Sequence, residues 1–437
     1  MLLSRYCSLY PCHGDPDSLM LFSAKRGATI LIPASMLDDI RTGALADEER
    51  KTLIELGFLN SDIEAERAEI LGFIDELNAL HKSLDITVVL NLDCNLACTY
   101  CFEGKRKGRF FLSRETANRI VDFIKNRDFT DKKEIKVTFY GGEPLLSTEL
   151  IAYISEELKS FAESKGLDYR FSLVTNGTLL TAKMVDRLLP LGLHGAKITL
   201  DGPQELHDAF RPFTSGSGSF DAIIDNIKAV NGKVRIQIGG NYTRDNYQEF
   251  PCLLDYLSEE GLGPDNIAAI KFDPVMRESE EFALPDFNDG CCSINEPWLF
   301  GASVFLRNEI LRRGYRTPKI VPSPCIVELR DSYVVNYDGA LYKCPGLIGR
   351  EHYCIGTVKD GVKEYRQSHN LDNWKNEECL GCVHLPLCFG GCRYIKVVHD
   401  GTMSGIDCKR PFLDAVLGEL VYQDIAYGRE EEKEERS

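Results

Sequence analysis

The sequence predicts an α/β protein built around a partial, TIM-like (β/α)6 barrel. Three observations support this prediction. Apolar strand-like runs alternate with amphipathic helix-like runs through the middle of the chain, which is typical of a parallel sheet with right-handed crossovers. Three cysteines follow the first of these strands, and many more gather in the last third of the chain. The expected divisions are a small α+β segment, the barrel, a cysteine-rich segment, and a helix with a charged tail, at 1–82, 83–310, 311–412 and 413–437.

The overall composition limits the classes of function. A chain of 437 residues suggests two to three domains, and its net charge of −16 argues against nucleic acid as the main partner. No apolar run reaches the ~18 residues that span a bilayer, and no signal-peptide pattern begins the chain. We therefore expect a cytoplasmic protein with no membrane partner. In that reducing compartment the 16 cysteines are expected to be metal ligands or buried thiols rather than disulfides.

The first segment predicts a β-hairpin followed by helices. Apolar runs at 19–23 and 29–33 flank a short Ala-Lys-Arg-Gly turn. Cys7 and Cys12 match no cluster spacing and are interpreted as ordinary thiols. This content suits a small winged-helix unit, and the alternative is an extension that packs on the barrel. The helices are expected at about 35–40, 47–56 and 62–80.

The barrel segment predicts six β-α units, which indicates a partial barrel rather than the closed eight-stranded one. Ser113 is the expected N-cap of the first helix. The predicted strands are 85–91, 135–140, 169–174, 196–200, 233–241 and 267–273. The helices between them are expected at about 113–124, 147–163, 182–190, 219–230 and 246–259.

Unusual residues follow the carboxyl ends of these strands, where parallel barrels place their active sites. We therefore expect them to share one rim of the barrel. In strand order they are Cys94, Cys98 and Cys101, then Gly141, Gly142, Glu143 and Pro144, then Asn176, Asp201, Asn241 and Asp273.

The cysteine run after the first strand has the chemistry of a cluster site. Cys94, Cys98 and Cys101 are separated by three and two residues. Thiolates are the preferred ligands of iron–sulfur clusters, and a cluster normally takes four. Three ligands leave one iron with open positions, as in a catalytic metal site. The alternatives are a loop with stray thiols or a zinc site that lacks a ligand.

This run, with Tyr100 directly before Cys101, resembles the cluster motif of the radical S-adenosylmethionine (SAM) superfamily. The resemblance implies a [4Fe–4S] cluster whose open iron is chelated by SAM. An electron entering the sulfonium would then release methionine and a 5′-deoxyadenosyl radical. It also implies that the segment Gly141 to Pro144 holds the methionyl amine, since glycines allow close approach and Glu143 can accept from an ammonium group.

The remaining rim residues are candidates for cofactor binding or catalysis. Asn176 and Asn241 are expected to contact SAM, and Asp201 and Asp273 are candidate catalytic residues, although polar turn residues are often structural. The stretch from Asp201 to Arg211 and Pro212 resembles radical SAM sulfatase and peptide maturases. Arg211 could hold a carboxylate of SAM or of a peptide and is a third catalytic candidate. His207 and Asp208, in the same stretch, are as well explained by ordering the loop.

Seven later cysteines match, in order, the pattern of the SPASM domain, which carries two auxiliary iron–sulfur clusters. Zinc is the physical alternative, because paired Cys-x-x-Cys also suits zinc ribbons. The fourth ligand of the first auxiliary cluster is left open between Cys291, Cys292, Cys354 and a substrate thiolate. By position, the resemblance assigns one cluster to Cys379, Cys382, Cys388 and Cys408, and the other to Cys325, Cys344 and Cys392.

One departure from the related families is informative. A predicted hairpin with an Asp-Gly turn delivers Cys344, and Pro345 follows it. Sulfatase maturases place a catalytic aspartate at the position of Pro345. Proline has no side-chain base, so this departure disfavours sulfatase maturation.

The sequence therefore predicts a radical SAM/SPASM enzyme that modifies a ribosomally made precursor peptide, most similar to the geopeptide-type maturases. A thioether or carbon–carbon crosslink is the expected product. The N-terminal segment would bind the peptide leader as an added edge strand, and flavodoxin or ferredoxin would donate electrons. The alternatives are a sulfatase-type maturase and a non-catalytic iron–sulfur redox protein, and the glycine-rich segment on the cysteine rim argues against the redox protein.

Overall fold

A ten-stranded sheet runs through the computed structural model, which describes residues 2–279, 283–284, 287 and 289–434. Its strand order is β11-β10-β9-β8-β7-β6-β12-β13-β14-β15. The strands from β6 to β11 pair in parallel, which confirms the predicted parallel barrel sheet. These six strands are β6 (Ser83–Asn91), β7 (Glu134–Gly141), β8 (Asp168–Thr175), β9 (Leu193–Thr199), β10 (Arg235–Tyr242) and β11 (Ile267–Pro274).

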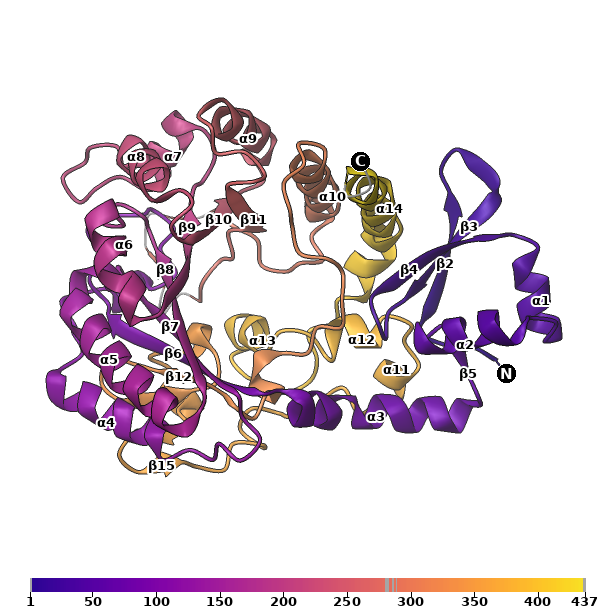
Figure 1. The fold of residues 1–437 in the computed structure, drawn as a ribbon, viewed down its shortest axis with the longest axis horizontal. Coiled ribbons are helices and arrows are strands. Elements are labelled where there is room, and N and C mark those ends of the chain that lie inside the picture. The colour runs from indigo at the N-terminus through magenta and orange to yellow at the C-terminus, as the bar shows by residue number, and fades with distance from the viewer. Residues whose placement is uncertain (1, 280–282, 285–286, 288, 435–437) are drawn as a thin grey trace.

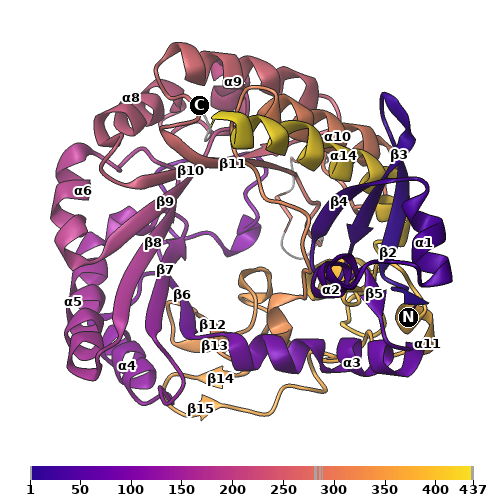
Figure 2. The ribbon, with the colours of Figure 1, turned by 45° about the vertical axis from the view of Figure 1, so that its right-hand side comes forward.

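Helices cover the outer side of the curved sheet (Figures 1 and 2). Ser113 caps the first of them by accepting a hydrogen bond from the Thr116 backbone N–H, as predicted. The buried faces of these helices and of the strands form one large hydrophobic core. The helices are α4 (Arg114–Lys125), α5 (Thr148–Lys165), α6 (Ala182–Leu188), α7 (Gln204–Phe210), α8 (Phe220–Val230) and α9 (Phe250–Glu259).

The cysteine-rich part extends the same sheet. Strand β12 (Ser332–Val335) pairs in parallel with β6, and β13 (Ala340–Tyr342) pairs back on β12 as the predicted hairpin. The sequence indicated the hairpin but not its attachment to β6, because short buried strands carry no signal for their neighbour. The hairpin and the strand that leads into the first cysteine run are therefore neighbours. Two short strands, β14 (Gly356–Thr357) and β15 (Gly361–Val362), complete the sheet.

The N-terminal part contains a three-stranded antiparallel sheet in the order β2-β3-β4. The predicted hairpin corresponds to β3 (Asp15–Ser23) and β4 (Ala28–Pro33). The prediction missed β2 (Cys7–Cys12), whose Pro11 weakens any strand signal. The remaining elements are α1 (Met36–Thr42), α2 (Asp47–Glu55), α3 (Ile63–Leu80) and the paired short strands β1 (Leu2–Leu3) and β5 (Leu59–Asn60).

This N-terminal part packs on the cysteine-rich part. Tyr6 and Ile70 share a buried cluster with Trp374 and Leu417. The Tyr6 hydroxyl also donates to the Leu380 carbonyl at 3.2 Å. The elements that supply this surface are α11 (Glu377–Leu380), α12 (Leu385–Cys388), α13 (Arg393–Asp400) and α14 (Arg410–Glu434).

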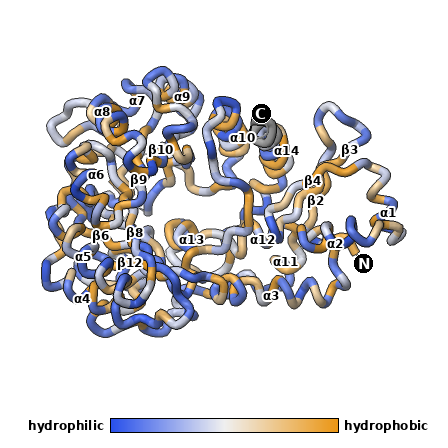
Figure 3. Tube along the Cα trace, viewed as in Figure 1, coloured by the Kyte–Doolittle hydropathy of each residue, from blue (hydrophilic) through white to orange (hydrophobic). Residues whose placement is uncertain are grey.

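Helix α10 (Pro297–Leu311) lies beside α14, and Figure 3 shows hydrophobic stretches on both. The sequence predicted a helix followed by a charged tail within 413–437. The helix instead continues to Glu434, because glutamate, lysine and arginine are good helix formers. Residues 435–437 of the predicted tail lie outside the described residues. Within the described residues, no helix is both long enough and apolar enough to cross a bilayer.

Candidate active site

The carboxyl ends of the barrel strands open into a cavity of about 500 Å³. Most of the predicted rim residues line it together with two cysteines from the C-terminal part of the chain. The predicted residues in its lining are Cys94, Cys98, Cys101, Gly141, Gly142, Asn176, Arg211, Asn241, Cys344 and Cys392.

Backbone hydrogen bonds hold the first cysteine loop. The Ala97 N–H donates to the Pro212 carbonyl at 2.8 Å, and the Thr99 N–H donates to the Phe210 carbonyl at 3.0 Å. The cysteine loop therefore lies alongside residues 210–212 at the end of α7, and the two segments pair through their backbones. Burial raises the pKa of the Cys94 thiol to about 11 and that of Cys101 to about 12. Cluster ligands bind as thiolates, so loading this site releases protons.

The glycine pair after β7 permits a close backbone contact with the same loop. A Cβ on Gly141 would lie 2.3 Å from the Asn91 carbonyl oxygen, and one on Gly142 would lie 2.1 Å from that of Asp93. Gly141 also has a φ of +140°, which L side chains rarely adopt. Only glycine fits at these two positions, and both line the cavity next to Cys94.

Glu143 and Pro144 do not line the cavity, and the expected contact of Glu143 with the methionyl amine stays a prediction. The Glu143 side chain is fully buried, and its carboxylate accepts from the Thr175 hydroxyl at 2.8 Å and from the Asn176 N–H at 2.8 Å. A third bond comes from the Leu145 N–H. These donors occupy the carboxylate that was expected to receive an ammonium group. Glu143 joins the loops after β7 and β8.

Asp201 and Arg211 belong to one buried network. The Arg211 guanidinium donates to the Tyr100 hydroxyl at 2.8 Å, and the Asn241 side chain donates to the same oxygen at 3.0 Å. Tyr100 in turn donates to the Asp201 carboxylate, which also accepts from the Asn241 backbone N–H at 2.7 Å. Asp201 is fully buried and faces these partners rather than the cavity. It neutralises Arg211 and positions Tyr100, the residue before Cys101.

His207 and Asp208 order the loop, which was the second interpretation offered for them. His207 Nδ1 accepts from the Asp201 N–H at 3.2 Å, and Asp208 accepts from the Ser219 N–H at 2.7 Å. Burial lowers the pKa of His207 to about 3, so its ring is neutral. Asn176 lines the cavity, and its amide donates to the Asn95 side chain at 2.8 Å, inside the cysteine loop.

Asp273 does not join the other candidates. Its carboxylate pairs with Lys271 at 2.6 Å, and it lines a different cavity on the far side of the β11 terminus. The sequence placed it correctly at a strand end but could not show the direction of its side chain. Its expected catalytic role has no support in this geometry.

Four of the C-terminal cysteines surround a separate small cavity of about 30 Å³. Burial raises the pKa of the Cys388 thiol to about 11, and the Cys379 and Cys382 thiols nearby act in the same direction. The set is the one that the SPASM resemblance predicted. Its members are Cys379, Cys382, Cys388 and Cys408.

Cys325, Cys344 and Cys392 form the other C-terminal group. Burial raises the pKa of the Cys344 thiol to about 12, and the nearby thiols of Cys325 and Cys392 add to the shift. None of the three proposed fourth ligands lines the cavity that Cys344 and Cys392 share. The Cys291 thiol is buried against Met276, Cys292 is exposed, and the Cys354 thiol donates to the Gly356 carbonyl.

Sequence reasoning missed three charged residues in the active-site cavity, Glu103, Lys107 and Lys197. Glu103 is 5% exposed, one of its carboxylate oxygens has no partner among the described residues, and burial raises its pKa to about 7. Lys197 lies on β9 and also lines the cavity. A charged residue in an otherwise apolar parallel strand was a usable signal for Lys197. Glu103 follows Cys101 in an irregular loop and carried no such signal.

The donor sets fit iron–sulfur clusters. Cys94, Cys98 and Cys101 line the larger cavity with Cys344 and Cys392, and four further thiols surround the smaller one, as the corners of a cluster require. Among the described residues, no set of three or more His, Cys, Asp or Glu side chains converges closely enough for a single metal ion.

The model of the radical SAM superfamily matches residues 88–250, which are the strands and loops that build this rim. The chain therefore contains a radical SAM domain, and it is an enzyme of the radical SAM class. Such a domain binds a [4Fe–4S] cluster and SAM, and the further cysteines fit additional clusters.

The comparisons extend beyond this domain. The chain is 24% identical over 389 residues to a cysteine-type anaerobic sulfatase-maturating enzyme from Clostridium novyi, covering 79% of this chain and 99% of the relative. The structure of anSMEcpe with bound AdoMet and the Cp18Cys peptide superimposes with a TM-score of 0.63 at 20% identity, over 78% of this chain and 99% of that one. The structure of Streptococcus suis SuiB bound to its precursor peptide SuiA superimposes with a TM-score of 0.53 at 13% identity, over 93% of this chain and 98% of that one. These likenesses to solved structures establish the fold.

Proposed function

We propose that this enzyme modifies a ribosomally made precursor peptide and forms a thioether or carbon–carbon crosslink in it. The observation that carries the proposal is the shared cavity, in which Cys94, Cys98 and Cys101 face Cys344 and Cys392. A cluster with SAM on the first group supplies a 5′-deoxyadenosyl radical when bound. The cavity gives a substrate side chain access to both groups at once.

In this proposal the chain's own residues bind and orient. Gly141 and Gly142 offer backbone groups to the methionyl amine. Arg211 and Asn241, held by Asp201, line the cavity where a carboxylate or a ribose would lie. Asn176 fixes the cysteine loop through Asn95 and lines the same wall.

The C-terminal thiols are proposed to hold two auxiliary clusters. Cys379, Cys382, Cys388 and Cys408 would provide a complete ligand set around their small cavity. Cys325, Cys344 and Cys392 would hold the other cluster. Its fourth ligand stays open between Cys291, Cys292, Cys354 and a substrate thiolate, because Cys325 itself, like these three cysteines, does not line the shared cavity.

The proposed partners are a precursor peptide and an electron donor such as flavodoxin or ferredoxin, in the cytoplasm. SuiB, whose structure was determined with its precursor peptide SuiA bound, shares its fold with 93% of this chain. The outer strands of the N-terminal sheet, β2 and β4, offer edges to which a peptide leader could add.

A sulfatase-type maturase is the second candidate, and the similarity to the Clostridium novyi enzyme favours it. The residue after Cys344 argues against it, because Pro345 provides no base. Asp273 and Asp201 do not replace that base, because neither lines the active-site cavity.

Coexpression tests the two candidates. The enzyme is produced with short peptides encoded beside its gene, and separately with a peptide that carries a sulfatase maturation sequence. Our proposal predicts a loss of two hydrogen atoms per crosslink in the precursor peptide, with the linkage located by tandem mass spectrometry. Conversion of a cysteine or serine to formylglycine in the sulfatase peptide, with the precursor unchanged, would contradict it.

A further inference from the structure

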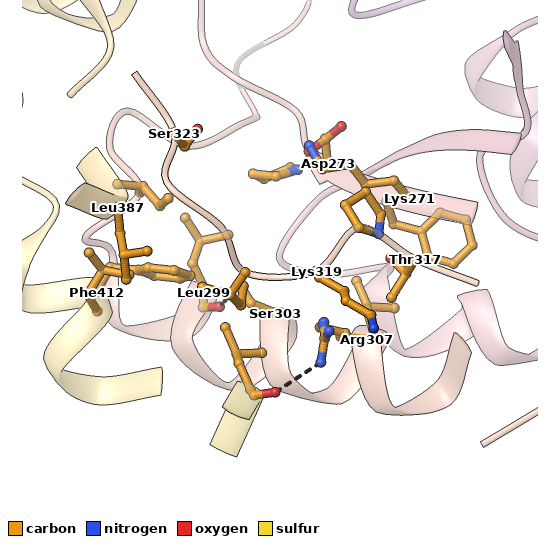
Figure 4. A pocket seen from close by; sticks show the side chains of 18 of the residues that line it. Lys271, Asp273, Leu299, Ser303, Arg307, Thr317, Lys319, Ser323, Leu387 and Phe412 are labelled. Carbon is orange, nitrogen blue, oxygen red and sulfur yellow. Dashed lines mark hydrogen bonds and ion pairs between the residues drawn. The ribbon is translucent and has the colours of Figure 1, made fainter. Parts of the chain in front are cut away.

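A second cavity, of about 540 Å³, lies between the end of β11, helix α10, the segment 317–323 and the start of α14 (Figure 4). The proposed cluster groups do not line it. Pro274 lines both this cavity and the active-site cavity, so only the end of β11 separates the two. Its position makes it a site beside the reaction centre rather than a part of it.

The charges around this cavity are unbalanced. Lys271 pairs with Asp273 at 2.6 Å, and Arg307 pairs with Asp424 at 2.5 Å. Two further lysines in the lining, Lys319 and Lys409, have no recorded hydrogen bond or ion pair from their ammonium groups to any described residue. The chain as a whole has a net charge of −16, so this cationic surplus is local. It attracts a ligand that carries carboxylates.

The cavity has an apolar end and a basic end. Figure 4 shows Leu387, Leu299 and Phe412 grouped on one side, and Lys319 and Lys271 on the other. A ligand that fills both ends carries large apolar side chains beside acidic ones.

The cavity also borders the N-terminal part of the chain. Gly27, in the turn between β3 and β4, packs so closely on the segment 317–323 that a Cβ there would lie 2.8 Å from the Ile320 carbonyl oxygen. The adjacent Val321, which lines the cavity, is 50% exposed. The cavity therefore borders both the N-terminal sheet and the active-site cavity.

We propose, building on the proposed function, that this second cavity binds a segment of the precursor peptide in which acidic residues alternate with large apolar ones. Lys319 pairs with a carboxylate of that segment, and the end formed by Leu299 and Phe412 receives an apolar side chain. The cavity thereby holds the peptide between the N-terminal sheet and the reaction centre.

Fluorescence anisotropy with the reconstituted full-length enzyme tests this inference. The probes are two labelled peptides of equal length, one of alternating glutamate and leucine and one of alternating lysine and leucine. We expect the acidic peptide to bind and the basic one not to. Added salt should weaken binding, because Lys319 is exposed.

Variants locate the binding. Lys319→Glu should weaken the acidic peptide about tenfold, the loss of one favourable charge pair plus a repulsion, and Lys319→Met should weaken it less. Phe412→Ser tests the apolar end and should also reduce affinity. The matched control is Lys359→Glu, an exposed lysine in the turn between β14 and β15, which should leave affinity unchanged.

Equal binding of both peptides, or equal effects of Lys319→Glu and Lys359→Glu, would overturn the inference. Formation of 5′-deoxyadenosine without peptide distinguishes a failure of the proposed peptide site from a failure of the proposed function. If it is normal in Lys319→Glu while peptide affinity is unchanged, the second cavity is not a peptide site and the proposed function stands. If the wild type forms none, the proposed function fails whatever the peptides do.

Discussion

The cysteine group on the barrel rim and the four-cysteine group near the C-terminus use the same side chain in different settings. The rim group has three thiols that open into about 500 Å³ of space. The other has four thiols around about 30 Å³. An incomplete ligand set beside a large cavity is the design of a reactive site, and a complete set around a small one is that of a closed site.

The two groups are also held by different forces. Backbone hydrogen bonds from Ala97 and Thr99 fix the rim loop, and close glycine contacts support it. In the four-cysteine group, Cys379 and Cys388 lie on the short helices α11 and α12, which pack in a cluster with fully buried Trp374 and Phe389. The rim should therefore be sensitive to small changes in backbone shape, and the C-terminal part to changes in packing and buried charge.

The largest expected effect is at the rim glycines. In Gly142→Ala the new Cβ would lie 2.1 Å from the Asp93 carbonyl oxygen, next to Cys94, so the loop must move. We expect formation of 5′-deoxyadenosine to fall at least about 100-fold, since a misplaced reacting group costs that much. Iron in the C-terminal groups should be retained, as measured by iron analysis and Mössbauer spectroscopy.

The matched control is Gly72→Ala in α3, where a Cβ would meet nothing within 4 Å. It should leave activity unchanged and stabilise the helix by up to about 1 kcal/mol. Equal losses of activity in Gly142→Ala and Gly72→Ala would contradict the account of the rim.

The next effect concerns the buried ion pair of the cysteine-rich part. Arg393 follows Cys392 and pairs with Glu328 at 2.5 Å, with side-chain exposures of 1% and 3%. Glu328→Gln would leave Arg393 buried without a counter-charge, which costs about 3–5 kcal/mol. Denaturant unfolding of the protein should show the loss, together with reduced iron in the group of Cys325 and Cys344.

Arg67→Met, which breaks the exposed pair with Glu377, provides the comparison. Because solvent screens this pair, the variant should cost far less than Glu328→Gln. A loss in Glu328→Gln as small as that would show that the buried pair does not hold this part together.

A smaller effect is expected from the network behind the rim. Tyr100→Phe removes the hydroxyl that Arg211 and Asn241 contact, and it leaves the Asp201 carboxylate with one partner fewer. Losing a bond to a charged group costs about 1.5–3 kcal/mol, so the rate of 5′-deoxyadenosine formation should fall about tenfold or more. Tyr337→Phe, at a half-buried site outside this network, should not change it. An unchanged rate in Tyr100→Phe would show that this hydrogen-bond network does not support the reaction.

The smallest effect is the pH dependence of stability, which involves one histidine near each region. Burial lowers the pKa of His207 to about 3 and that of His369 to about 4. Each of these histidines binds a proton near pH 6.5 in the unfolded chain but not in the folded chain, so its contribution to stability falls as the pH drops from 6.5 toward these values. At pH 5.5 each histidine should cost about 1.4 kcal/mol relative to neutral pH.

Chemical denaturation of the cluster-free protein at pH 7.5 and 5.5 measures this cost. His207→Asn and His369→Asn should each remove about 1.4 kcal/mol of destabilisation between pH 7.5 and 5.5, whereas Glu103, whose pKa burial raises to about 7, acts in the opposite direction in every variant. A pH dependence that survives in the double variant must come from other groups.

The sequence predicted the strands and the cysteine groups well, because both are local patterns. Side-chain directions were not predictable. Glu143 points to the loop after β8 rather than to the cavity, and Asp273 points to the second cavity. The parallel pairing of β12 with β6 brings Cys344 to the rim and depends on contacts between residues far apart in the chain. Glu103 shows the same limit, since only the folded loop buries it.

Formation of 5′-deoxyadenosine tests the central claim, that the rim group and not the C-terminal groups binds the SAM-cleaving cluster. Fully reconstituted protein is incubated with SAM and dithionite and compared with the variant in which Cys94, Cys98 and Cys101 are alanine. We predict that the wild type forms the product and that the variant forms none while it keeps the iron of its C-terminal groups. Product from the variant, no product from a fully loaded wild type, or a variant without iron would contradict the account.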